Sequence, residues 1–148
     1  MSTDETTTNT DKLTRLRAAK ALRAAAAVET RETAEIECLE LEEKFSADGS
    51  RMGVDFAIVF DPDLGSEGII VLKLGADLAF RRFVDETVSA DGLASATGMY
   101  EFTAPAVVHP APELYAALIR KRGGLANRAC DALSSLHRVS GKKIEGKF

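Results

Sequence analysis

Three carboxylates between Asp61 and Glu67 are the first candidates for chemistry in this chain. Asp61, Asp63 and Glu67 flank Gly65, and carboxylates around a turn glycine resemble the ligands of a calcium-binding loop. The segment lacks the further early acidic ligand and the distal glutamate of the twelve-residue calcium motif. Aspartate, proline and glycine are also the usual residues of tight turns. We therefore interpret the segment as a turn and predict neither a metal site nor a bound cofactor.

The two histidines and two cysteines are the other residues that could bind a metal or catalyse a reaction. No C-x-x-C or H-x3-H spacing connects Cys38, Cys130, His109 and His137, so the sequence predicts no zinc site. Members of a catalytic triad can be distant in sequence. A small enzyme with a scattered active site therefore stays open as an alternative, and it requires a deep pocket that brings a histidine to a carboxylate. Phosphate-binding and nucleophile-elbow motifs are absent from the sequence, and we predict a protein without catalytic residues.

Composition favours one modest domain with an additional arm. Of the 148 residues, 45% are hydrophobic but only 6% are aromatic, and tryptophan is absent. The two cysteines are too few and too isolated for a disulfide framework. The N-terminus is polar and lacks the apolar core of a secretory signal, and no apolar stretch approaches the roughly 18 residues of a membrane span. We expect a reduced, cytoplasmic protein that does not enter a membrane.

Residues 11–44 are dominated by strong helix formers, and Asp11 can cap the helix. The segment from Asp11 to Val28 carries five bases and one acid, whereas Glu29 to Lys44 carries seven acids and two bases. This order opposes the helix dipole. A hairpin of the two halves, or antiparallel pairing with another chain, would turn the same charges into favourable contacts. We predict one long or kinked helix that contacts other molecules. A solvated helix lying on the core is the alternative, and a split near Thr30 stays open.

The candidate partner-binding residues are apolar side chains of this helix and a basic run further on. A stable protein contact needs an apolar anchor, and Leu13, Leu16 and Leu22 begin an approximate three-residue repeat. The basic run could contact an acidic protein surface or nucleic acid, but the net charge of −4 and the lack of interleaved aromatic residues make nucleic acid the weaker choice. The candidates are Leu13, Leu16, Leu22, Val28, Arg120, Lys121 and Arg122.

The remaining patterns predict an α+β fold with a long N-terminal helix, a small antiparallel β-hairpin or sheet, and C-terminal helices. The predicted elements are strands at 54–60 and 69–74, helices at 77–89, 112–122 and from 125 on, and an extended run at 106–109, with 93–105 ambiguous. Core contacts are expected from Leu78, Phe83 (or its neighbour Val84), Val88, Leu114, Tyr115, Leu118, Ile119, Ala129, Leu133 and Leu136. The predicted organisation is a disordered tail at 1–10, a charged helical arm at 11–46 and a domain at 47–148 with a basic, mobile tail from Ser140.

The order of several short segments carries a family resemblance. The segments are the hairpin Val54–Leu74, the helix with Ala79-Phe-Arg-Arg-Phe83, the Val107-Val-His-Pro110 break and the Arg122-Gly-Gly-Leu125 turn. In this order they resemble tail assembly chaperone-like proteins of tailed bacteriophages. The resemblance covers Val54 to Lys147 and leaves the first fifty residues as a variable helical arm. One departure is Gly-Gly before Leu125, where the family pattern leads us to expect Pro-Gly.

This resemblance implies a non-catalytic role in virion assembly, in the cytoplasm of the host cell. The expected partners are the tape-measure protein or the tail tube protein, bound during assembly, and an oligomer is possible. The alternative is a self-associating minor virion structural protein in which the N-terminal helix joins subunits. A defined oligomer of the purified chain would favour this alternative over a transient chaperone.

Overall fold

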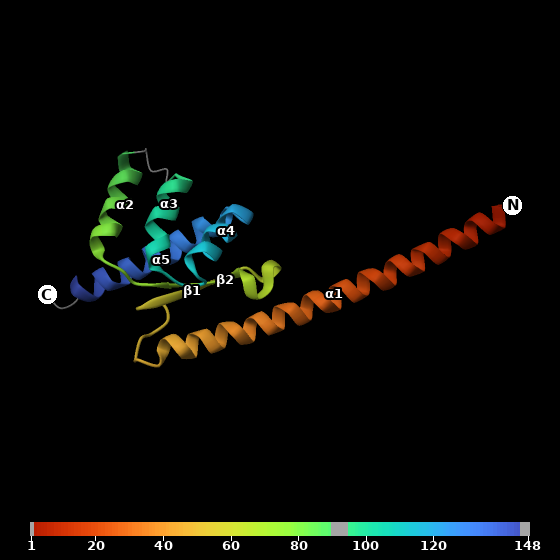
Figure 1. The fold of residues 1–148 in the computed structure, drawn as a ribbon, viewed down its shortest axis with the longest axis horizontal. Coiled ribbons are helices and arrows are strands. Elements are labelled where there is room, and N and C mark those ends of the chain that lie inside the picture. Colours follow the sequence, from red (N-terminus) through yellow and green to blue (C-terminus); the bar gives the residue numbers. More distant parts are fainter. Residues whose placement is uncertain (1, 90–94, 146–148) are drawn as a thin grey trace.

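Helix α1 is the longest element and spans Ser2–Ser46 without a break (Figure 1). It belongs to a computed structural model that describes the backbone of residues 2–89 and 95–145, and the surroundings of side chains 8–87 and 95–140. Thr30 and Thr33 do not split the helix. Their hydroxyls donate to the carbonyls one turn earlier, at 2.9 and 3.0 Å, so both hydroxyls are satisfied within the helix. The predicted disordered tail is wrong from Ser2 onward, since helix extension adds one backbone hydrogen bond per residue.

Three antiparallel strands form the sheet, in the order β1-β2-β3. Strand β1 spans Phe56–Phe60, β2 spans Ile69–Lys73 and β3 spans Val107–His109. The first four residues of β2 are all buried, because this strand lies in the centre of the sheet. The sheet lies between the C-terminal part of α1 and the later helices (Figure 1).

The remaining elements are short turns and helices that cover the sheet. They are η1 (Pro62–Gly68), α2 (Asp77–Ser89), α3 (Ala96–Thr103), η2 (Ala104–Ala106), α4 (Pro112–Lys121) and α5 (Gly124–Glu145). The α+β prediction is confirmed, and the ambiguous segment contains α3, whose N-cap Ser95 accepts a hydrogen bond from the Gly98 N–H at 2.9 Å. Helix α5 continues through the first residues of the predicted tail and ends at Glu145, and the mobility of this tail stays a prediction. Lys147 and the other residues beyond Glu145 lie outside the described residues.

Helix α5 supplies much of the core. The predicted core residues Ala129, Leu133 and Leu136 are at most 1% exposed. Two expected core contacts are wrong, because Leu78 is 69% exposed and Leu114 is 62% exposed. In α2 the inward positions are occupied by aromatic rings instead, and Phe83 stacks on Phe102 with ring centroids 4.6 Å apart.

A buried hydrogen bond joins α3 to α4 within the core. The Tyr115 hydroxyl lies 2.6 Å from the Thr103 hydroxyl, and Thr103 also lies 2.8 Å from the Met99 carbonyl. A threonine hydroxyl has one proton, which goes to the carbonyl, so Tyr115 donates to Thr103. Burial raises the pKa of Tyr115, which keeps the phenol protonated and able to donate.

Candidate partner-binding surface

The C-terminal third of α1 is held against the body, which we define as residues 47–145. Ala34 is completely buried, and Gly65 of η1, the turn that packs against α1, is also buried. A Cβ atom on Gly65 would lie 2.7 Å from Cγ2 of Thr30, so only glycine allows the helix and the turn to approach this closely. Further along, the rings of Phe45 and Phe56 lie 6.1 Å apart. These contacts fix the direction in which α1 leaves the body.

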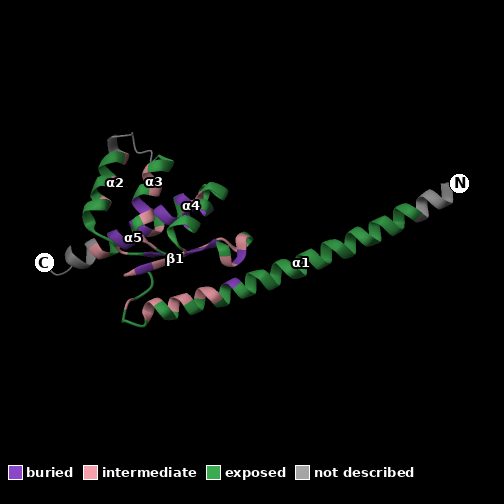
Figure 2. Ribbon diagram, in the orientation of Figure 1, coloured by how far each residue is buried: buried purple, intermediate pink, exposed green. Residues whose placement is uncertain are grey.

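We call residues 8–33 of α1 the arm; its last turn meets the body at Thr30, and the preceding turns project away from the body (Figure 1). Every side chain of the arm is exposed (Figure 2). The predicted solvated helix lying on the core therefore describes only the C-terminal third of α1. A helix exposed on all sides is held by its alanine-rich sequence and by its anchored end. Such a helix offers its full circumference to other molecules.

The four predicted apolar anchors are all exposed, but they do not share one face. Their exposed fractions are 47% for Leu13, 62% for Leu16, 73% for Leu22 and 56% for Val28. On a helix of 3.6 residues per turn, Leu13 and Leu16 lie about 60° apart, whereas Leu22 lies about 180° from Leu13. A repeat of three residues winds around the helix, whereas a face requires alternating steps of three and four. Of the four predicted anchors, Leu13 and Leu16 therefore remain as one pair that can contact the same partner surface.

The predicted basic run lies against the acidic turn that we considered as a calcium loop. Arg122 lies 3.8 Å from Asp61 and 3.9 Å from Asp63. Lys121 lies 3.9 Å from Glu67. The two charged segments therefore partly neutralise each other, and Arg120 is the exposed base of the run for which no such pair is described. The two segments are distant in sequence, so neither pattern alone indicated this pairing.

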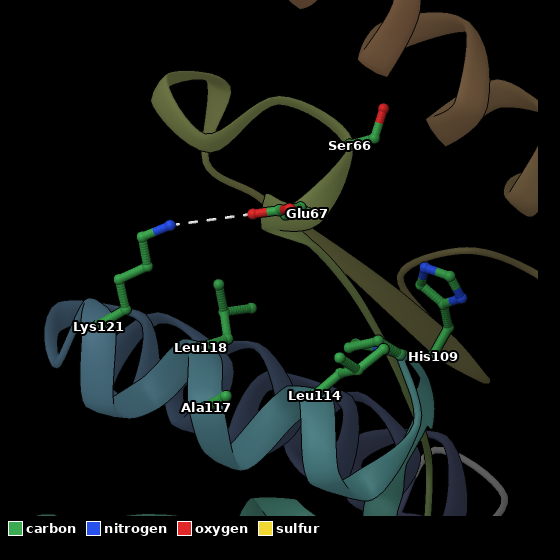
Figure 3. A pocket seen from close by; sticks show the side chains of 8 residues that line it. Ser66, Glu67, His109, Leu114, Ala117, Leu118 and Lys121 are labelled. Atoms are coloured by element: carbon green, nitrogen blue, oxygen red, sulfur yellow. Dashed lines mark ion pairs between the residues drawn. The ribbon is translucent and has the colours of Figure 1, made fainter.

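An apolar groove lies between α4, η1 and β3, with a volume of about 470 Å³ (Figure 3). Its lining residues are Ser66, Glu67, His109, Pro110, Leu114, Ala117, Leu118 and Lys121. The ion pair of Lys121 and Glu67 spans one part of the groove, and His109 lies at another. Burial and the nearby Lys44 charge lower the pKa of His109, opposed by Glu37, which favours the neutral imidazole. Sequence reasoning missed the groove, because Leu114, which lines it, was expected in the core.

The second histidine has the carboxylate neighbour that the enzyme alternative requires. Nδ1 of His137 lies 3.3 Å from Oδ1 of Asp77, beside a cavity of about 360 Å³. The ring is stacked on Phe80 with centroids 4.7 Å apart. Burial raises the pKa of the nearby Cys130 thiol, which disfavours the nucleophilic thiolate. In this setting His137 joins α5 to the start of α2 as a packed aromatic ring.

The described residues form neither a metal site nor a membrane-spanning helix. No group of three or more histidine, cysteine, aspartate or glutamate side chains in the described part is placed to hold a metal ion. Of the helices described, none is both long enough and apolar enough to cross a membrane. No family model, curated protein or solved structure matches this chain. The arm and the surface where it joins the body are therefore the features of this chain that bear on its function.

Proposed function

We propose that this chain is a non-catalytic protein-binding protein whose arm captures a partner during phage tail assembly. The observation that supports it is the arm itself, whose side chains from Thr8 to Thr33 are all exposed on a helix that projects from the body (Figure 1). A single exposed helix of this length gains no stability from burial. A long exposed helix of this kind is reasonable in a protein whose helix is covered by another molecule. The family resemblance suggests the tape-measure protein or the tail tube protein as that molecule.

Leu13 and Leu16 are the best apolar contacts for this partner. They lie within about 60° of Ala34 around the helix axis, on the side that meets the body further along α1. A partner bound there would extend toward the η1 end of the body. Lys20 and Arg23 are exposed on the same side of the arm, so an acidic partner surface with apolar residues fits best.

Co-purification tests this proposal. The chain is coexpressed with the tape-measure and tail tube proteins encoded in the same genome, and captured protein is quantified. We expect Leu13→Glu with Leu16→Glu to reduce capture about tenfold or more, because each loses an apolar contact worth roughly 1.5–3 kcal/mol when fully buried. The matched control is Leu22→Glu, the same change on the opposite side of the arm.

Two results would contradict the proposal. One is the failure of the wild-type chain to capture either tail protein. The other is an equal loss of capture for the Leu22→Glu control, which would indicate a general effect of acidic charge on the arm rather than a partner surface at Leu13 and Leu16.

A further inference from the structure

The side of α1 that faces away from the body carries a separate row of apolar side chains. Ile36 is 57% exposed and Leu39 is 60% exposed, whereas Ala34 is completely buried. On a helix of 3.6 residues per turn, Ile36 and Leu39 lie about 160° and 140° around the axis from Ala34. The row continues toward the N-terminus. We call it the outer stripe and define it as Thr14, Ala18, Ala21, Ala25, Val28, Glu32, Ile36 and Leu39.

The outer stripe has the spacing of a helix-pairing seam. Its members follow one another at steps of three or four residues, close to the 3.5-residue repeat that keeps a seam facing a partner helix. Each of them is exposed. The N-terminal part is small, with alanine at three successive positions, while Val28, Ile36 and Leu39 are large. A second helix that runs in the opposite direction would place large side chains against small ones.

One antiparallel register matches these sizes along most of the stripe. When the centre of symmetry lies between Ala26 and Ala27, Ala25 of one copy faces Val28 of the other. In the same register Thr14 faces Leu39, and Ala18 lies one residue from the position directly opposite Ile36. The charged member of the stripe, Glu32, faces Ala21, whose short side chain leaves the carboxylate a path to solvent. The same contacts repeat on both sides of the twofold axis, as an isologous interface requires.

The charges beside the stripe provide an independent argument for the same arrangement. Arg17 and Glu35 lie along one edge of the stripe, and Arg15 and Glu40 lie along the other. A twofold axis between antiparallel helices brings equal edges together. Arg17 then lies beside Glu35 of the second copy, and Arg15 beside Glu40. Parallel helices would instead place bases against bases and acids against acids.

We propose that two copies of this chain pair through antiparallel α1 helices along the outer stripe. The stripe is on the side of α1 opposite to Ala34, so the two bodies lie on the outside of the helix pair and do not collide. The pairing extends over residues 14–39, about 39 Å at 1.5 Å per residue. This inference does not require the proposed tail-assembly function, because the second copy and the tail protein use different sides of the arm.

Charge exchange on the purified full-length chain tests the pairing and its direction. One variant is Arg15→Glu with Arg17→Glu, and the other is Glu35→Lys with Glu40→Lys. Sedimentation equilibrium should find a wild-type dimer and, for each variant alone, a dimer dissociation constant about a hundredfold higher, since several edge contacts become repulsive. An equimolar mixture of the two variants should dimerise as tightly as wild type.

The matched control is Lys20→Glu with Arg23→Glu, the same charge reversal on the body-facing side of the arm. We expect its dimer dissociation constant to stay within about threefold of wild type, because neither side chain borders the stripe. A wild-type chain that stays monomeric at about 100 µM would overturn the proposal. So would a parallel pattern, in which wild type and both variants are equally weak and the mixture alone is tight. No tail protein is present, so this result is independent of partner capture.

Discussion

Helices α1 and α5 both carry apolar residues at steps of three and four, but they meet different surroundings. In α5, Leu125, Leu133 and Leu136 are 1–2% exposed because the sheet and neighbouring helices cover them. In α1, the outer stripe is uncovered, and three of its eight residues are alanine. Burying a leucine contributes roughly 1.5–3 kcal/mol, and an alanine much less. The comparison indicates that α5 contributes much of the stability of the fold. The arm of α1 contributes little to that stability and is available to other molecules.

Matched leucine-to-alanine substitutions in α5 and in the arm should give the largest difference in the free energy of unfolding. Leu133→Ala removes a side chain that is 1% exposed, and we expect a loss of about 3 kcal/mol in the free energy of unfolding, because a cavity remains in the core. Leu16→Ala, at 62% exposure, should change it by less than about 0.5 kcal/mol. Urea unfolding of both variants at a concentration well below any dimerisation measures the difference. Equal losses would show that the arm is part of the cooperative fold.

Substitution of Gly65, at the junction between arm and body, should destabilise the protein. Gly65 has φ 61° and ψ −141°, a conformation that is almost restricted to glycine, so Gly65→Ala should destabilise the protein by about 2 kcal/mol. The added methyl group also meets Thr30. Combining it with Thr30→Ser, which removes the contacted Cγ2 atom, should recover only the steric part of the loss. Thermal unfolding separates the two effects, and complete recovery in the double variant would show that backbone strain has no role.

A smaller contrast is expected from two threonine hydrogen bonds. Thr103→Val leaves the Tyr115 hydroxyl buried without its acceptor, at an expected loss of about 1–2 kcal/mol in unfolding free energy. Thr33→Val removes an exposed hydrogen bond of 3.0 Å to the Glu29 carbonyl, and water replaces it, so we expect less than about 0.5 kcal/mol. Chemical unfolding of both variants measures this. If Thr103→Val proved harmless, the core would have to relax around the phenol.

Local sequence patterns predicted most of the fold. Strands at 56–60 and 69–73, the helix from Pro112 and the inward residues of α5 follow from β-branched runs, proline placement and apolar spacing. The three-residue step through Leu13 and Leu16 was misleading, because it ignores the 3.6-residue turn of a helix. Leu78 was also misassigned, since the choice between it and the nearby phenylalanines depends on where α3 lies.

The candidate site was harder to predict from the sequence, because it depends on contacts between distant segments. The ion pairs of Arg122 with Asp61 and Asp63 join two segments that were judged separately in the sequence. The groove beside His109 requires α4, η1 and β3 together. The spacing of the outer stripe can be read from the sequence. The side of α1 on which it lies follows only from the structure, in which the buried Ala34 marks the side that faces the body.

The close approach of Thr30 to Gly65 also gives α1 the geometry of a lever. The helix leaves the body at this contact, and the segment from Thr30 to Thr8 is about 33 Å long at 1.5 Å per residue. A tilt of about 5° at this point would displace the far end sideways by about 3 Å. Small changes in packing at η1 therefore become larger lateral displacements of the side chains near the tip, where a bound partner would have to follow them.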